Sequence, residues 1–314
     1  MTDTTAVALV TGANKGIGYA VAAGLAARGM TVVLGCRDRD RGEQAAARLR
    51  AELSAARMGV GPSITSMPAE PDAAHLRAEP DAARLGTGPD VASLGTGPDA
   101  SLGTRPGAVN LPTGPGVAYA AGVEPEVRVV VLDVTDPATI EAAAASLDRL
   151  DVLVNNAGIS GPIDLTPSRT PATTIRDVFE TNVIGVLMVT NAMLPLLRKA
   201  PAPRIVNVSS GVGSLHHHTD PAHYMSALPA SAAYPPSKAA LNALTVQYAK
   251  ELREDGILVN AAAPGACATD FTKGLPFPIT RTAEEGAGVI IQLATLGPDG
   301  PTGGFFDDGG PVPW

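Results

Sequence analysis

The strongest indication of the fold is a stretch near the N-terminus, Ala6-Val7-Ala8-Leu9-Val10-Thr11-Gly12-Ala13-Asn14-Lys15-Gly16-Ile17-Gly18. Its first five residues are apolar and predict a short buried parallel strand. A glycine turn follows, and residues 19–28 are rich in Ala, Leu and Val, as expected of a helix. Such a turn can be only a tight connection, but between a strand and a helix it favours a phosphate cradle of backbone N–H groups at a helix N-terminus. The stretch therefore predicts nucleotide binding by Gly12, Asn14, Lys15, Gly16, Ile17 and Gly18.

Strands and helices alternate along the rest of the chain, which indicates a parallel sheet with helices on both faces. Further strands are expected at residues 31–35, 127–132, 151–155, 204–208, 257–262 and 304–306, and further helices at 38–57, 173–199, 231–255 and 283–296. The predicted fold class is α/β, a single doubly wound Rossmann-type domain over residues 1–314.

Residues 59–124 do not fit this alternation. They are rich in Pro, Gly, Ala and Asp, and they repeat themselves, since 70–74 return at 79–83 and 85–90 return at 94–99. Such a segment cannot bury enough apolar surface to offset the entropy lost on ordering. We predict a low-complexity, disordered insertion that interrupts the domain, either a tolerated repeat expansion without function or a tether for a partner.

Composition excludes several classes of protein. The 314 residues are 45% hydrophobic, enough for one large core, and the formal net charge of -8 without a basic tract argues against a nucleic-acid partner. Two cysteines, Cys36 and Cys267, without a secretion signal predict a reducing, cytoplasmic compartment. The N-terminus carries no long apolar stretch, so no membrane association is expected.

A second motif, Tyr234-Pro235-Pro236-Ser237-Lys238, opens an apolar helical run. Residues four apart on a helix share one face, so Tyr234 and Lys238 are expected to lie together. A cation beside a phenol favours the phenolate, and a tyrosine whose pKa is ordinarily near ~10 can then act as a general acid or base closer to neutral pH. The same spacing occurs in helix-surface pairs without a function, but the glycine turn favours the catalytic interpretation.

Further motifs follow the order typical of one family, and the chain resembles the classical, carbonyl-reductase-like short-chain dehydrogenases/reductases. The motifs run through nearly the whole chain outside the insertion: Thr11–Gly18, Asp133-Val134, Asn155-Asn156-Ala157-Gly158, Asn182, Ser209-Ser210, Tyr234/Lys238, and Pro264-Gly265 through Thr269. The resemblance implies an enzyme that reduces a ketone or aldehyde to an alcohol by hydride transfer from NADPH.

The resemblance also implies a role for each motif residue. Tyr234 would donate a proton to the alkoxide, and Lys238 would lower the tyrosine pKa and bind the nicotinamide ribose. Ser210 would polarise the carbonyl, with Ser209 as the competing candidate. Asn182 would hold a water that connects the lysine to solvent, or would be a buried amide that bends its helix. Cofactor contacts are implied for Tyr234, Lys238, Asp133, Val134, Asn155, Ala157, Gly158, Pro264, Gly265 and Thr269.

The residue after the second strand contacts the adenosine ribose in this fold. Arg37 stands there, and its planar guanidinium suits a phosphate, while Lys15 adds a second cation. In the family that the chain resembles, basic residues at both places go with NADP(H), which is the predicted cofactor; a solvated Arg37 is the alternative. Asp38 is expected to cap the next helix, and Asp133 to lie near the adenine or to cap a helix as well.

The gap between Ser210 and Tyr234 is longer than in most members of that family and contains histidines 216–218 and 223. Adjacent histidines on a loop make poor convergent ligands, so no metal site is predicted and the histidines are expected to shape a substrate entrance or to be solvated. The longer gap leaves the oligomeric state open between monomer and homo-oligomer. Candidate walls of the substrate pocket, with core packing as the alternative, are Phe271, Phe277 and Tyr224.

Two other functions stay open beside reduction of a small-molecule carbonyl. An NADP-dependent alcohol dehydrogenase that runs in the oxidative direction would use the same residues. A non-catalytic NADP(H)-binding regulator would have no need of the phenol–ammonium pair.

Overall fold

The computed structural model describes residues 5–58, 125–162, 165–275 and 278–314, all of which belong to one compact unit. Its centre is one eight-stranded sheet with the strand order β3-β2-β1-β4-β5-β6-β7-β8. Neighbouring strands are parallel except β7 and β8, which pair antiparallel. The predicted insertion at residues 59–124 lies outside the described residues.

The elements lie close to their expected bounds. The strands are β1 (Val7–Thr11), β2 (Thr31–Cys36), β3 (Val127–Val131), β4 (Val152–Asn155), β5 (Arg204–Val208), β6 (Leu258–Ala262), β7 (Phe305–Asp307) and β8 (Gly310–Pro311). The α-helices are α1 (Gly16–Ala26), α2 (Arg39–Arg57), α3 (Pro137–Ala145), α4 (Ala172–Phe179), α5 (Gly185–Leu197), α6 (Leu215–Thr219), α7 (Tyr234–Glu251) and α8 (Ala283–Ala294). The prediction missed α3, α6 and β8.

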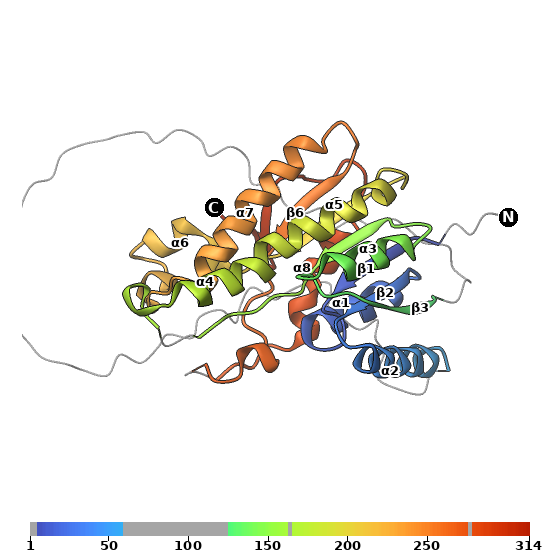
Figure 1. Ribbon diagram of the computed structural model, residues 1–314, viewed down its shortest axis with the longest axis horizontal. Coiled ribbons are helices and arrows are strands. Elements are labelled where there is room, and N and C mark those ends of the chain that lie inside the picture. Colours follow the sequence, from blue (N-terminus) through green and yellow to red (C-terminus); the bar gives the residue numbers. More distant parts are fainter. Residues whose placement is uncertain (1–4, 59–124, 163–164, 276–277) are drawn as a thin grey trace, which may run out of the picture. The chain divides into compact units, whose positions relative to one another are not determined.

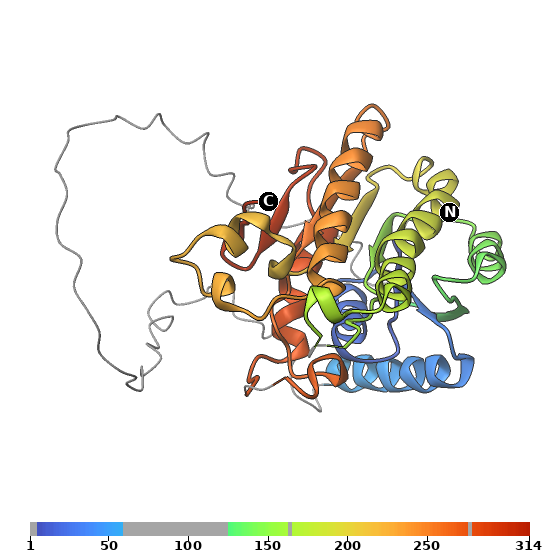
Figure 2. The same ribbon diagram turned by 60° about the vertical axis from the view of Figure 1, so that its left-hand side comes forward.

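Helices cover both faces of the sheet (Figures 1 and 2). Side chains of α1, α2 and α8 form one hydrophobic core with one face of the strands, and α3, α5 and α7 form a second core with the other face. Along β1, Val10 belongs to the first core and Leu9 to the second, because successive side chains of a strand point to opposite faces. This arrangement confirms the predicted doubly wound α/β fold class.

The strand order reverses at β1, which lies between β2 and β4. In sheets of this kind ligands bind outside the carboxyl ends of the strands at such a reversal. The glycine turn follows β1, residues 156–158 follow β4, the serine pair follows β5, and Pro264-Gly265 follows β6. The topology therefore gathers most of the predicted site motifs at one edge of the sheet, the carboxyl edge.

One continuous helical stretch, Ala172–Leu197, joins α4 and α5 through a π-helical turn at Glu180–Ile184. In the described part of the chain it is the one helix long and apolar enough, by length and composition, to cross a membrane. Its inner residues Val189, Met193 and Leu197 are fully buried in the second core. Packing against the sheet therefore accounts for its apolar composition.

Two aspartates, Asp38 and Asp133, were expected to cap helices, and the structure confirms one of these caps. Asp38 accepts a hydrogen bond from the Arg41 N–H at the start of α2, as expected. The alternative role of Asp133 as a cap is wrong, because Asp136 caps α3 by accepting from the Ala138 N–H. Asp133 instead accepts hydrogen bonds from the N–H and the hydroxyl of Thr135.

Candidate active site

The glycine turn after β1 needs its glycines. Gly12 and Gly16 have φ of 66° and 58°, in the left-handed region that favours glycine. A Cβ on Gly18 would lie 2.4 Å from the Asn156 Nδ2 and 2.6 Å from the Gly12 carbonyl oxygen, so a larger residue does not fit. Lys15, the N-cap of α1, makes no side-chain capping bond, which leaves the first N–H groups of the helix available to an anion.

Amide side chains at the end of β4 form hydrogen bonds to both neighbouring strands. The Asn155 Nδ2 donates to the Asn207 Oδ1 of β5 over 2.9 Å. The Asn156 Nδ2 donates to the Thr11 carbonyl of β1 over 2.8 Å, and the Thr11 hydroxyl accepts from the N–H groups of Asn156 and Ala157. The buried Asn155 thus links β4 to β5, and Ala157 lies beside Gly12 of the glycine turn.

The remaining predicted cofactor residues lie along the same edge. Arg37 is exposed at the end of β2, and the Gly12 N–H donates to the Gly35 carbonyl of that strand over 2.8 Å. Val134 is buried after β3, where its carbonyl would lie 2.7 Å from a Cβ on Gly185. Arg37 thus follows the strand end that the glycine turn bonds, and Val134 packs against the start of α5.

The segment after β6 reaches back to the glycine turn. A Cβ on Gly16 would lie 3.4 Å from the Thr269 Cγ2, so these two predicted cofactor residues are neighbours. Gly265 has φ of 74°, and the Arg281 Nε donates to the Pro264 carbonyl over 2.8 Å. The structure thus brings the last predicted motif of the chain to the first.

Three of the four predicted catalytic side chains, those of Ser210, Tyr234 and Lys238, lie near one another. Tyr234 opens α7, and Ser210, at the end of β5, lies close enough to its hydroxyl to lower the pKa of the phenol. The Lys238 Nζ lies 5.6 Å from the centroid of the Tyr234 ring and donates to the Val208 carbonyl over 2.7 Å. The end of β5 and the first turn of α7 therefore place a hydroxyl, a phenol and an ammonium group together.

Burial shifts the pKa values of both groups on α7. It raises the pKa of Tyr234 to about 12, an effect that the hydrogen bond from Ser210 opposes, and it lowers the pKa of Lys238 to about 8. We expected Lys238 to lower the tyrosine pKa; instead desolvation raises it, and the group that opposes the rise is Ser210. The phenol is therefore protonated at neutral pH, the state that a proton donor needs.

Asn182, the fourth predicted catalytic residue, comes from a different element, the π-helical turn Glu180–Ile184. It is fully buried in the π-helical turn, where the Gly185 N–H donates to the Glu180 carbonyl five residues back. Its side chain accepts from the Ile159 N–H over 2.9 Å and donates to the Ile159 carbonyl over 2.9 Å and to the Ser237 Oγ over 3.0 Å. This geometry supports the interpretation as a buried amide in a helix distortion.

The two competing serines have different surroundings. Ser209 is buried, and its hydroxyl donates to the Asn242 Oδ1 over 2.6 Å. Ser210 is partly exposed and contacts Tyr234. A substrate can therefore reach Ser210 beside the phenol, while the Ser209 hydroxyl is occupied.

The candidate walls of the substrate pocket lie in different parts of the structure. The Phe271 ring lies 5.5 Å from the Tyr234 ring, between centroids, and the residue is 44% exposed. Tyr224 is exposed and lies against the His223 ring. Phe277 is outside the described residues. Phe271 thus borders the phenol and Tyr224 belongs to the histidine region.

The histidines lie on α6 and in the loop after it. The His217 and His223 rings stack with centroids 3.8 Å apart and an interplanar angle of 10°. In the chain as described, no group of three or more His, Cys, Asp or Glu side chains could hold a metal ion.

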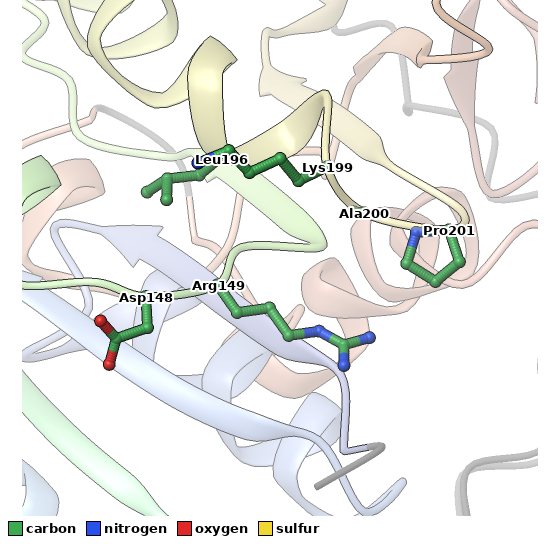
Figure 3. Close-up of a pocket in the computed structure, with 6 residues that line it drawn as sticks. All are labelled: Asp148, Arg149, Leu196, Lys199, Ala200 and Pro201. Carbon is green, nitrogen blue, oxygen red and sulfur yellow. The ribbon is translucent and has the colours of Figure 1, made fainter. Parts of the chain in front are cut away.

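A pocket of about 470 Å³ lies at the opposite edge of the sheet, which we call the amino edge (Figure 3). Asp148 and Arg149 precede β4, and the other lining residues, Leu196, Lys199, Ala200 and Pro201, precede β5. The guanidinium of Arg149 is engaged by Asp151, with nitrogen–oxygen distances of 2.7 and 2.8 Å. The pocket is therefore remote from the phenol and the ammonium group, and the chemistry of the carboxyl edge marks the candidate active site.

A doubly wound sheet with a glycine cradle, and with a phenol beside an ammonium group at its carboxyl edge, defines a class of nicotinamide-dependent oxidoreductases. The chain belongs to the short-chain dehydrogenase family, whose model matches residues 6–74 and 116–276. This confirms the resemblance seen in the sequence. Family membership supports oxidoreductase activity on small molecules and binding of a nicotinamide cofactor.

Individual relatives cover different shares of the chain. A short-chain dehydrogenase, anuI, of Penicillium roqueforti is 40% identical over 54% of this chain and 68% of its own. Salutaridine reductase of Papaver bracteatum is 26% identical over 96% of this chain and 93% of its own. Among solved structures, the NADPH-bound carbonyl reductase from chicken fatty liver is 26% identical with a TM-score of 0.66 and covers 99% of both chains.

Proposed function

We propose that this protein is an NADPH-dependent carbonyl reductase that converts a ketone or aldehyde into an alcohol. The observation that carries the proposal is the contact of Tyr234 with Ser210 beside Lys238. The phenol carries its proton at neutral pH, and reduction needs a proton donor. The likeness to a reductase crystallised with NADPH and to salutaridine reductase supports the same direction of reaction.

Each side chain has a separate task in this proposal. The Ser210 hydroxyl donates a hydrogen bond to the carbonyl oxygen of the substrate and fixes its position. NADPH, when bound, supplies the hydride that reduces the carbonyl carbon. Tyr234 transfers its proton to the oxygen as that oxygen becomes negative, and Lys238, held by the Val208 carbonyl, stabilises the tyrosinate that remains.

The glycine turn fits a dinucleotide phosphate. Its glycines leave room that a Cβ would fill, and the N-terminus of α1 lies directly behind them. Lys15 and Arg37 are exposed cations at this edge, which suits the additional 2′-phosphate of NADP(H). Cofactor contacts by Asp133, Thr269 and the other predicted residues belong to the same proposal.

Asn182 has a positioning role in this proposal. Its side chain bonds Ser237, and the Ser237 hydroxyl donates to the Tyr234 carbonyl over 2.7 Å. The amide therefore steadies the first turn of α7, which carries the phenol. A role of Asn182 in holding a water near Lys238 stays a prediction, as do the single domain over residues 1–314 and the cytoplasmic location.

The test is the oxidation of NADPH against a panel of ketones, aldehydes and quinones. We expect turnover with NADPH, weaker turnover with NADH, and a loss of about 10²- to 10⁴-fold in kcat in Tyr234→Phe, because that variant lacks the transferable proton. NADPH binding without turnover across the panel would favour a non-catalytic regulator. Faster oxidation of alcohols with NADP⁺ than reduction of any carbonyl would favour the dehydrogenase.

A further inference from the structure

The cation of the glycine turn is already engaged by a distant part of the chain. The Lys15 Nζ donates to the Asp270 Oδ2 over 2.7 Å, across 255 positions of sequence. Asp270 also pairs with Lys273, and hydrogen bonds from Lys15 and then Lys273 lower the pKa of Asp270 to about 2. A carboxylate that is charged at every physiological pH therefore holds the ammonium group.

Arg37 gives the contrasting case. It is exposed at the end of β2, and among the described residues none forms an ion pair with it. Lys15 has to exchange or share its carboxylate before it can bind a phosphate, whereas Arg37 does not. The two anions would be close together on one ammonium group, and like charges repel.

Asp270 belongs to a short, tightly bonded turn. Thr269 and Thr272 cap the 3-10 turn Asp270–Thr272 reciprocally, and the Thr272 hydroxyl donates to the Cys267 carbonyl over 2.6 Å. Phe271, the middle residue of this turn, lies against the Tyr234 ring at 5.5 Å between centroids. A change at Asp270 therefore reaches the neighbour of the catalytic phenol within one residue.

We propose that Asp270 is a specificity-determining residue that competes with the 2′-phosphate of NADP(H) for Lys15 and couples this competition to the position of Phe271 over Tyr234. The inference rests on the proposed function. It implies that NADPH displaces Asp270 from Lys15 and loosens the Asp270–Thr272 turn, while NADH, which lacks the 2′-phosphate, leaves both in place.

The first test measures the Kd of NADPH and of NADH by titration calorimetry for the wild type, Asp270→Asn, Lys15→Met and the double variant. We expect Asp270→Asn to bind NADPH about two- to fivefold more tightly, the range of an exposed ion pair, and to bind NADH within about 1.5-fold of the wild type. In the Lys15→Met background the same change should have no effect on NADPH. Asp255→Asn, which removes the exposed ion pair with Arg198, is the matched control and should change neither Kd.

The second test measures amide hydrogen exchange of residues 268–273 in the wild type and in Asp270→Asn. Because Thr269 is a proposed contact for either cofactor, the two complexes are compared with each other: we expect residues 270–273 of the wild type to exchange faster with NADPH bound than with NADH bound, and Asp270→Asn to exchange faster than the wild type before any cofactor is added. Equal protection with the two cofactors would overturn the coupling to the turn.

The outcomes separate the inference from the proposed function. Preference for NADPH in the wild type, with an unchanged NADPH affinity in Asp270→Asn, would overturn the inference alone. An effect of Asp270→Asn that persists in the Lys15→Met background would do the same, because it would not act through Lys15. Tighter binding of NADH than of NADPH by the wild type would overturn the proposed cofactor, and the inference with it.

Discussion

The two edges of the sheet differ in the state of their polar groups: those at the amino edge are paired, and those at the carboxyl edge have shifted pKa values. At the amino edge, Arg149 pairs with Asp151, and the buried Arg204 donates to the Leu296 carbonyl. At the carboxyl edge, burial moves the pKa of Tyr234 up and that of Lys238 down. Groups with such shifts gather at functional sites, so a hollow at the amino edge is weaker evidence of chemistry than the shifted pair at the other edge.

The largest expected effect concerns the two serines at the carboxyl edge, Ser209 and Ser210. Ser210→Ala should lower kcat by about 10²- to 10³-fold, because a donor to the developing oxyanion is lost. Ser209→Ala should instead lower the free energy of unfolding by about 1–3 kcal/mol, because the buried Asn242 Oδ1 loses its donor. Steady-state kinetics and urea unfolding measure the two effects, and a greater loss of kcat in Ser209→Ala would exchange the roles.

A smaller effect is expected at the amino edge. Arg149→Met should lower the free energy of unfolding by about 1–2 kcal/mol, because the buried Asp151 loses a cation, and the partial exposure of Arg149 reduces the full cost of a broken buried pair. The kcat should not change. The control is Arg198→Met, which removes an exposed partner of Asp255 and should cost about 0–1 kcal/mol. A fall in kcat in Arg149→Met at unchanged stability would show that the amino edge also contributes to catalysis.

The smallest expected effect concerns pH. Burial, and then the nearby His223 and His216, lower the pKa of His217 below its ordinary value of 6.5. The unfolded chain then binds more protons than the folded one just below pH 6.5, so stability present above that pH is lost as the pH falls through the folded pKa. In urea unfolding at pH 7.5 and 5.5, His217→Phe should lose less stability on acidification than the wild type.

The difference in this pH experiment should not exceed about 1.4 kcal/mol, because pH 5.5 lies one unit below the ordinary histidine pKa and one pKa unit corresponds to roughly 1.4 kcal/mol. His216→Phe is the control, because His216 is exposed and its replacement should leave most of the acid loss in place. Identical acid losses in the wild type and His217→Phe would show that His217 does not carry this part of the stability.

Buried strands were predictable from the sequence, and short surface elements were not. Strand β1 lies within one residue of its predicted stretch because the continuous apolar run of residues 6–10 indicates burial on both faces. Helix α3 was missed although Asp136-Pro137 is a typical start of a helix, with an N-cap followed by Pro at N1. The two-residue β8 pairs with β7 and has no pattern of its own.

The site shows a similar limit. Motif order indicated which residues would meet at the carboxyl edge, and the topology brings them there. The direction of the Tyr234 pKa depends on burial, and the pairing of Lys15 with Asp270 joins residues 255 positions apart. Neither property is a function of local sequence, so both required the folded chain.

The Asn182 side chain stands in for a neighbouring strand. Its Oδ1 accepts from the Ile159 N–H and its Nδ2 donates to the Ile159 carbonyl, as the backbone of a paired strand would. An aspartate has the same shape, but when ionised it can only accept, so two of the three bonds would become contacts between acceptors. At this position, the exchange of the amide nitrogen of Asn182 for an oxygen would break the hydrogen-bond network, although no carbon atom would have to move.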